Sequence, residues 1–418
     1  MAFGSIFNRS TRPRRTARDM ARIEGYRRAW LYYSSPDGDP YRAQGADPGL
    51  SAFKGLPDYI TAFLNYAPYI VDVDLHFLFA DHDLTSVSAS GKSARDRELR
   101  EFGEAIGLDT VVRSAALTAL VCGDAWVKVI PDPDSAAGVR MVHVDPAAVH
   151  PRLDAHDCAT EREVVISYGY RDEEDRLRRW TELWTPDLRE VWRDGEQVTE
   201  ESGPNPLGLI PLVHFSCMPV PGSYFGRPAF AQIISDMDRM NTALGALLEV
   251  FRYYGSPKLI LKGFMAPEME LDPDARQFWQ IPSGDAEISF LEWRNTTGLM
   301  DEILKLDSIV RRKLPEFVLD RVSDRAYPTS GFAVSLQLSL LDAKIAAIAS
   351  SFAPSVARLV EMALFVAGKS AEAVKVGSGN RPAGSWRDKA DAVTRLLDSG
   401  LVKEDEARNA LAVDALLD

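Results

Sequence analysis

Apolar residues recur at helical spacing early in the chain. Between residues 56 and 79 they step by three or four positions, which predicts a helix that Pro68 should kink or divide. A second helical pattern runs from 96 to about 121, and Gly123 should end it before a strand begins. Two helical segments therefore precede the first β-type pattern.

The period changes between residues 125 and 215. Apolar and polar residues alternate in six short runs separated by Pro, Gly and Asp, which predicts a mostly antiparallel β region. The runs are AWVKVI, GVRMVHV, AVHPRL, REVVISYGY, RWTELWT and REVWRDG. Packing across strands explains the aromatic residues of this region better than a ligand platform does. These residues are Tyr168, Tyr170, Trp180, Trp184 and Trp192.

The most informative pattern lies between residues 206 and 333, where two long helices enclose a short β segment. The β-like run PLGLIPLVHF is followed, after Pro228, by an apolar helical face of about six turns. SPKLILKGF and AEISFLEW are typical of strands, and a second helix is predicted from 297 to 314. Two long helices around a small β segment form a poor core for a small-molecule enzyme. They are better suited to lining the path of an elongated ligand.

The pattern changes again after Pro315. LDRVSDRAYPTSG is too polar and too rich in turn residues for a core, so a loop is predicted there. From residue 332 a helix continues past 348, and Pro354 predicts a kink or a break in it. A Gly/Ser-rich linker then leads to two further helices, SWRDKADAVTRLLDSG and KEDEARNALAV.

Arginine dominates the N-terminal segment. Residues 1–28 hold eight arginines against Asp19 and Glu24, which predicts a solvated or partly helical arm, with contact to phosphate as the less favoured alternative. The run from 36 to 48 is rich in Pro, Gly and Asp and is predicted to be a loop.

Composition limits the possible functions. A chain of 418 residues, 46% of them hydrophobic, should form about two or three domains. Its formal charge of −13 argues against tight binding to nucleic acid or anionic lipid. DNA near the protein would therefore be directed along it without being bound tightly. No signal peptide is predicted, and the apolar stretch 345–367 is broken by Pro354 and two charged residues, so no membrane contact is expected.

Motifs that would indicate chemistry are weak. A GKS sequence lacks the first glycine of a phosphate loop, and no nucleophile elbow or HExxH motif occurs. A group of histidines, His143, His150 and His156, lies near Cys158 in the sequence. These side chains are best explained as polar residues that face loops of the β region, and a metal site is the minor alternative. No cofactor is predicted. The cysteines are too few and too far apart for disulfides and are predicted to be buried small hydrophobes: Cys122, Cys158 and Cys217.

Five segments carry a resemblance to a known family. DTVVRSAALTALVCGDAWVKVIPD contains a helix, a glycine and a strand, VHVDPAAVHPRLD contains two strands joined by a DP turn, and GLIPLVHF is a further strand. FGRPAFAQIISDMDRMNTALGALLEVFRYYGSPKLILKG and FLEWRNTTGLMDEILKLDSIVRRKLPE carry the two long helices. In this order they resemble the wing, first stem helix, clip and second stem helix of the portal proteins of tailed double-stranded DNA bacteriophages, in the branch with a short crown.

The resemblance implies an α+β portal fold with a β-rich wing, paired stem helices, a small clip, a tunnel loop closed by TSGFA, and a long kinked helix. The N-terminal arm matches no part of the family. The implied division is arm and loop 1–55, wing 56–226, first stem helix 227–254, clip 255–293, second stem helix 294–314, tunnel loop 315–331, kinked wing helix 332–376 and crown 377–418.

The resemblance also implies a function. The chain would form a ring, a dodecamer in this family, at one capsid vertex of the virion after assembly in the host cytoplasm. Double-stranded DNA would pass through it without sequence recognition, and an acidic lumen would oppose tight phosphate binding. The expected partners are the terminase large subunit, a head–tail adaptor, and the major capsid and scaffolding proteins. Another head–tail adaptor or minor capsid protein, or less favourably a metal-dependent hydrolase, remains the alternative.

Three sets of residues are candidates for these roles. The tunnel-loop candidates for DNA contact are Asp320, Arg321, Ser323, Asp324, Arg325, Tyr327 and Thr329. The stem candidates for lumen-facing charge are Asp236, Asp238, Glu249, Asp301 and Asp307. The clip candidates for docking the terminase or an adaptor are Lys258, Lys262, Phe264 and Trp279.

Overall fold

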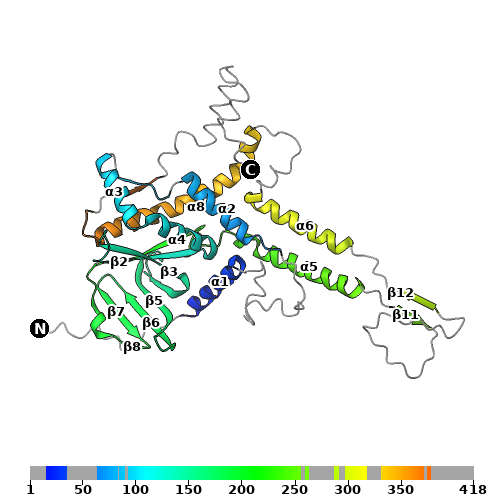
Figure 1. The fold of residues 1–418 in the computed structure, drawn as a ribbon, viewed down its shortest axis with the longest axis horizontal. Helices are drawn as coiled ribbons and strands as arrows, with labels where there is room; N and C mark the ends of the chain where they lie inside the picture. Colours follow the sequence, from blue (N-terminus) through cyan, green and yellow to red (C-terminus); the bar gives the residue numbers. More distant parts are fainter. Residues whose placement is uncertain are drawn as a thin grey trace, which may run out of the picture. The chain divides into compact units, whose positions relative to one another are not determined.

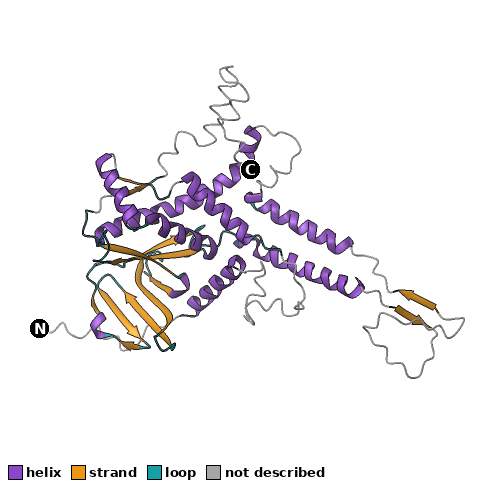
Figure 2. Ribbon diagram, in the orientation of Figure 1, coloured by secondary structure: helices purple, strands orange, loops and turns teal. Residues whose placement is uncertain are grey.

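The computed structural model shows a mixture of helices and strands (Figures 1 and 2), so the expected α+β class is confirmed. The residues it describes are 16–34, 64–82, 84–89, 93–255, 259–262, 287–290, 297–317, 331–370 and 374–377. The chain divides into two compact units. Unit 1 comprises Met1–Leu50, Asn65–Gln232 and Leu314–Asp418, and unit 2 comprises Ser51–Leu64 and Ile233–Lys313.

Unit 1 contains the β region, and the predicted antiparallel pairing is confirmed for its described strands. One sheet has the order β10-β2-β3, and the other has the order β4-β5-β6-β7-β8, with β9 also paired to β7. The bounds are β2 Asp124–Pro131, β3 Val139–Val144, β4 Val149–Leu153, β5 Glu161–Arg171, β6 Leu177–Trp184, β7 Leu188–Arg193, β8 Glu196–Gln197, β9 Gly203–Pro204 and β10 Leu212–Ser216.

Local sequence explains the larger sheet. Trp180 pairs in register with Tyr168 on one neighbouring strand and with Arg193 on the other. The guanidinium of Arg193 lies 5.4 Å from the ring centroid of Trp180. Strands β7 and β8 are joined through Asp194 and Gly195, which both have positive φ, as a tight hairpin turn requires.

The helices of unit 1 cover the smaller sheet, since α4 and α8 pack against β2 and α8 also packs against β10 (Figure 1). Trp126 of β2 and Phe215 of β10 are completely buried, and Phe215 meets Phe352 of α8 edge to face at 6.0 Å. The bounds are α1 Ala17–Ser34, α2 Ala67–His82, α3 Ser93–Ala105, α4 Leu108–Cys122, the 3-10 turn η2 Pro146–Ala148, the 3-10 turn η3 Thr199–Glu201, the 3-10 turn η5 Pro315–Phe317 and α8 Gly331–Val366.

Two helix predictions are corrected. Helix α2 begins at Ala67, so Pro68 lies in the first turn, where its missing N–H breaks no helical hydrogen bond and no kink results. The pattern from 96 to 121 is not one helix, because Gly107 adopts a left-handed conformation and α3 and α4 meet there at a bend of 67°. The predicted stop at Gly123 is confirmed, with φ of 93°.

The arginine-rich segment is not simply a solvated arm. Residues 17–34 form α1, whose Ile23, Tyr26, Ala29 and Tyr32 are at most 5% exposed. The prediction of a partly helical arm is correct, but that of solvation is wrong for this helix, because its apolar residues recur every three positions and are buried. Strand β1 (Val87–Ala89) was also not predicted, and it pairs with β13 (Val374–Val376).

Helix α8 is continuous through Pro354, so the predicted break is wrong and the kink stays a prediction. Its segment Leu338–Val366 is long and apolar enough to cross a membrane by length and composition, but half of the tested window is buried. A core helix passes the same test. The prediction that all cysteines are buried holds for Cys122 and Cys217, whereas Cys158 is exposed in a turn with φ of 53°.

Unit 2 matches the helix, β insert and helix predicted for it. Helix α5 spans Ile234–Gly255 and follows a 3-10 turn, η4, at Ala231–Ile233. Helix α6 spans Thr297–Lys313, as predicted. Between them in sequence, β11 (Leu259–Lys262) pairs antiparallel with β12 (Glu287–Phe290).

Candidate functional site

The two helices of unit 2 pack through apolar faces. On α5, Met237, Met240 and Leu247 are at most 3% exposed, and on α6 Leu306 and Val310 are at most 6% exposed. These positions recur every three or four residues, as the sequence pattern required. The polar stem candidates therefore lie around a defined packing face.

A buried amide fixes the start of unit 2. Asn241 is 4% exposed, and its Oδ1 accepts a hydrogen bond from the Leu64 N–H at 2.9 Å, while its Nδ2 donates to the Leu64 carbonyl at 2.9 Å. Both ends of the buried amide are therefore satisfied, which avoids the penalty of an unpaired polar group.

Two of the five stem candidates are neutralised by neighbouring cations. Asp236 Oδ2 lies 2.5 Å from Lys313 Nζ, and Asp307 Oδ2 lies 2.9 Å from Arg311 Nε. A further ion pair joins Arg239 to Glu302 at 3.2 Å. The helix pair therefore presents less negative charge than its acidic residues alone suggest.

The five stem candidates do not share one face. Successive residues of an α-helix are rotated by about 100°, so Asp236 and Asp238 point about 160° apart around α5. Position 249 stands about three turns after Asp238 and returns to the same face. On α6, Asp301 and Asp307 are about 120° apart, and Asp301 is exposed. Asp238 and position 249 thus form the one aligned pair on α5.

The other candidate sets lie largely outside the described residues. Lys262 is the last residue of β11, opposite Glu287 in β12, and its side chain is not described. The remaining clip candidates and all tunnel-loop candidates belong to segments outside the description: Lys258, Phe264, Trp279, Asp320, Arg321, Ser323, Asp324, Arg325, Tyr327 and Thr329.

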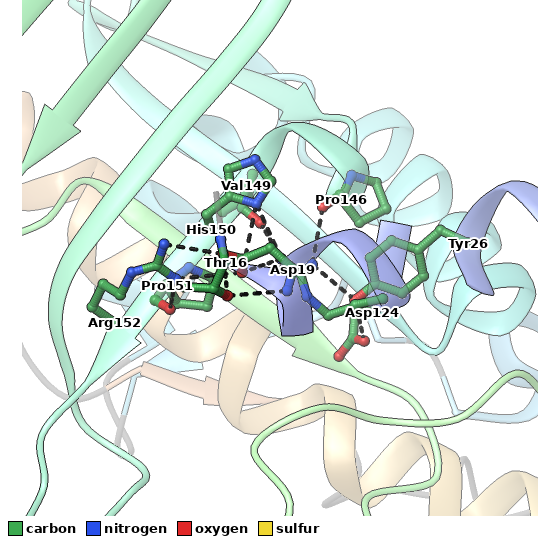
Figure 3. Close-up of polar contacts among 10 residues, drawn as sticks. Thr16, Asp19, Tyr26, Asp124, Pro146, Val149, His150, Pro151 and Arg152 are labelled. Atoms are coloured by element: carbon green, nitrogen blue, oxygen red, sulfur yellow. Dashed lines mark hydrogen bonds and ion pairs between the residues drawn. The ribbon is translucent and has the colours of Figure 1, made fainter. Parts of the chain in front are cut away.

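A polar network missed by sequence reasoning fixes α1 to the β region (Figure 3). Arg22 of α1 donates from Nη2 to the Val149 carbonyl at 2.8 Å and from Nη1 to the Pro146 carbonyl at 3.3 Å. Asp19 of α1 accepts from Arg152 of β4 at 3.0 Å. Since Arg22 and Arg152 are embedded in arginine-rich or alternating segments, nothing in the sequence distinguishes them.

The electrostatics of Asp19 follow from this network. Burial favours the neutral acid, but hydrogen bonds from Arg152 and from the N–H and hydroxyl of Thr16 outweigh it and hold the pKa of Asp19 well below its usual range. The carboxylate is therefore charged at neutral pH and links the start of α1 to β4.

A second buried carboxylate joins three segments. Asp124 at the start of β2 accepts hydrogen bonds from Tyr26 Oη at 2.6 Å and from the Gly226 N–H at 2.9 Å. His214 Nε2 lies 2.8 Å from the same carboxylate, and its ring contacts the rings of Trp126 at 4.4 Å and Tyr224 at 4.7 Å. With both carboxylate oxygens engaged and the imidazole packed against aromatic rings, this Asp–His pair is suited to holding structure.

The histidines of the alternative metal site go to separate environments. His150 is buried beside Arg22 and Asp19, burial lowers the pKa of His143, and His156 is exposed in a turn. Asp157 Oδ1 accepts from the Ala159 N–H at 2.9 Å and so closes that turn. Among the residues that the structure describes, no group of three or more His, Cys, Asp or Glu side chains is placed to hold a metal ion.

The described residues make an α+β chain in which one unit holds the two antiparallel sheets and the other holds the helices α5 and α6. The family model described as "Phage portal protein, SPP1 Gp6-like" matches residues 61–375, which reach into both units. The chain belongs to this family of phage portal proteins. The family is structural rather than enzymatic, and its members are components of the virion capsid vertex. No curated protein matches the chain.

Proposed function

We propose that the chain is the subunit of a ring at one capsid vertex, a dodecamer, through which double-stranded DNA is packaged and later ejected. The observation that carries this proposal is the family match over residues 61–375. The proposed ring docks the terminase large subunit during packaging and a head–tail adaptor afterwards, and contacts the major capsid and scaffolding proteins during assembly in the host cytoplasm.

The two units take the roles of the domains implied by the family. Unit 1 supplies the wing, with α8 as the kinked helix behind the tunnel loop, and unit 2 supplies the stem helices α5 and α6 with the clip between them. Residues 377–418 would form the crown. On this division the clip candidates dock partners, and the tunnel loop 315–331 contacts DNA through its candidates between Asp320 and Thr329.

Exposed apolar side chains on the stem helices support assembly. Met300 and Leu304 of α6 are 48% and 59% exposed, and Phe251 of α5 is 50% exposed. Large apolar side chains that the chain itself leaves uncovered are typical of surfaces that another protein covers. In the proposed ring a neighbouring subunit covers them through a heterologous contact, which forms a ring when the rotation between neighbours closes.

The lumen hypothesis centres on α5. Asp238 and position 249 are the aligned acidic positions on this helix. A negative lumen repels the DNA backbone, which carries about one charge per 1.7 Å, and so prevents tight binding that would oppose sliding. Asp301, exposed on α6, is assigned the same role.

The experiment compares DNA packaging by rings carrying Asp238→Lys with Glu249→Lys and by unchanged rings. We expect the variant to package more slowly, and the defect to shrink as salt is raised, because added lysines bind phosphate electrostatically. The matched control is Glu174→Lys with Glu196→Lys, which makes the same charge change at exposed positions of unit 1.

Both variants are first shown to form rings, so that a packaging defect is not an assembly defect. Equal packaging rates for the stem variant and the unchanged ring at low salt would contradict the lumen role of α5. An equal slowing in the control variant would show that total charge, not channel charge, is responsible.

A further inference from the structure

Three buried charged groups join elements of unit 1 that are far apart in the sequence. Lys344 of α8 places its Nζ 2.7 Å from Asp74 Oδ2 of α2 and in contact with Glu316 Oε1 of η5. The side chains of Asp74 and Glu316 are at most 1% exposed, and that of Lys344 is 9% exposed. The cluster therefore lies in the dry interior of unit 1.

The cluster is not balanced in charge. Two carboxylates face one ammonium, and an uncompensated charge in a dry site is costly enough that a group usually neutralises instead. Asp74 Oδ1 and Glu316 Oε2 are both buried, and neither has a hydrogen-bond partner among the residues that the structure describes. A carboxylate oxygen without a donor, beside a second carboxylate, is where an additional proton is held most easily.

Tyr69 and Cys217, further titratable residues described near the cluster, do not balance its charge. Tyr69 of α2 donates from its hydroxyl to the Glu316 carbonyl at 3.4 Å and stacks on Phe317 at 5.1 Å. Cys217, just after β10, is fully buried, and burial together with the charge of Asp74 raises the pKa of its thiol. Neither a phenol nor a thiol can carry a positive charge, so neither supplies the missing one.

The titration behaviour agrees with the geometry. Burial raises the pKa of Asp74 to about 8; the charge of Lys344 opposes this rise and the charge of Glu316 adds to it. Burial alone would lower the pKa of Lys344, but the two carboxylates outweigh it and raise that pKa above its ordinary value. Lysine thus stays charged while the carboxyl pair exchanges a proton near neutral pH.

We propose that Asp74, Glu316 and Lys344 form a proton-dependent clasp that holds Pro315–Phe317 against α2 and α8. The native cluster holds a proton that the unfolded chain releases above pH of about 4. The clasp is therefore strongest below pH of about 4 and loses stabilisation progressively as the pH rises to about 8, above which Asp74 is ionised in both states.

The clasp stands on described contacts and does not depend on ring formation. Its consequence for DNA does rest on the proposed function. Glu316 lies in the proposed tunnel loop 315–331, shortly before its first DNA-contact candidate, Asp320, so the clasp holds the start of that loop in place.

Hydrogen exchange of the full chain, measured by mass spectrometry between pH 6 and 9 and corrected for intrinsic rates, tests the clasp. In the unchanged chain, protection of the peptide spanning 314–317 should fall by up to about tenfold per pH unit between pH 6 and about 8, and level off above it, where Asp74 is ionised in both the closed and the opened state. Asp74→Asn and Glu316→Gln each leave one carboxylate for Lys344, so each should flatten this dependence.

Glu182→Gln is the matched control, because Lys128 and Glu182 form a buried one-to-one pair at 2.5 Å without a second carboxylate. It should leave the pH dependence at 314–317 unchanged. A flat profile in the unchanged chain, or an undiminished slope in both Asp74→Asn and Glu316→Gln, would overturn the proposal. A chain that forms no rings but shows this pH dependence of protection would contradict the proposed ring and leave the clasp intact.

Discussion

At the scale of single residues, buried charge decides how distant segments are joined. Asp19, Asp124 and Glu182 are each buried, and each accepts hydrogen bonds from groups remote in sequence. For Glu182 burial opposes ionisation, but the charge of Lys128 and its hydrogen bonds lower the pKa of the carboxyl below its usual value. Such pairs contribute stability only while the carboxylate is charged.

Asp19→Asn tests this at α1. Because the native pKa of Asp19 is lowered, its stabilisation is present above the unfolded-state pKa of about 3.9 and is lost as pH falls through the native value. We expect the variant to be less stable by about 2–3 kcal/mol at pH 7, since it loses the charge that Arg152 faces. Urea unfolding between pH 7 and pH 3 measures the effect.

The same titration provides the control for Asp19→Asn. The difference in stability between the two chains should shrink as the pH falls below 4. Asp109→Asn, at an exposed ion pair with Arg113, should change stability little at any pH. A difference for Asp19→Asn that is constant from pH 7 to pH 3 would contradict the assigned charge.

At the scale of elements, close backbone approach organises the junction between α4 and β2. The Cys217 N–H donates to the Gly123 carbonyl at 2.8 Å, and the Arg227 N–H donates to the Cys217 carbonyl at 2.8 Å. Gly226 lies between these backbone segments. A Cβ at this position would fall well inside contact distance of the Cys217 and Gly123 carbonyl oxygens. Only glycine fits, because backbone oxygens cannot rotate away.

Gly226→Ala should therefore be strongly destabilising, by about 3 kcal/mol or more, or should prevent folding. Gly203→Ala is the matched control, since a Cβ at Gly203 would meet nothing within 4 Å. The midpoint of urea unfolding, or the yield of folded chain, measures the difference. Equal stability of the two variants would contradict the close approach at Gly226.

The elements also show what sequence can predict. Strands β2 to β7 were found within a few residues, because alternation is a local signal that the pleat imposes directly. The pairing of β1 with β13 was missed, because it joins Val87–Ala89 to Val374–Val376 and depends on contacts that no local pattern contains. The bend at Gly107 was missed because a glycine within an apolar helical pattern is often tolerated.

Candidate residues were predicted less well than elements. Alignment of Asp238 with position 249 follows from helical period, but the pairing of Asp236 with Lys313 does not, since it depends on how α5 and α6 pack. The cluster of Asp74, Glu316 and Lys344 was missed for the same reason. Residues that hold distant elements together leave no periodic trace in the sequence.

At the scale of the whole molecule, the proposed function requires that copies of the chain assemble with one another. The chain belongs to the phage portal proteins, and unit 2 leaves Met300, Leu304 and Ile309 of α6 at least 43% exposed. A net charge of −13 per subunit would place high negative charge around any ring, so assembly must draw on apolar contact and tolerate repulsion. Low ionic strength should therefore weaken the ring, and moderate salt should favour it.

Electron microscopy of the purified chain, with native mass measurement of the same sample, tests the central claim most directly. The account predicts closed rings at micromolar concentration with a mass of about twelve times the 46.3 kDa chain. Met300→Asp with Leu304→Asp should abolish the rings, whereas Leu177→Asp, an exposed apolar residue of unit 1, should not. A folded chain that stays monomeric across salt conditions, with no ring particles, would contradict the account.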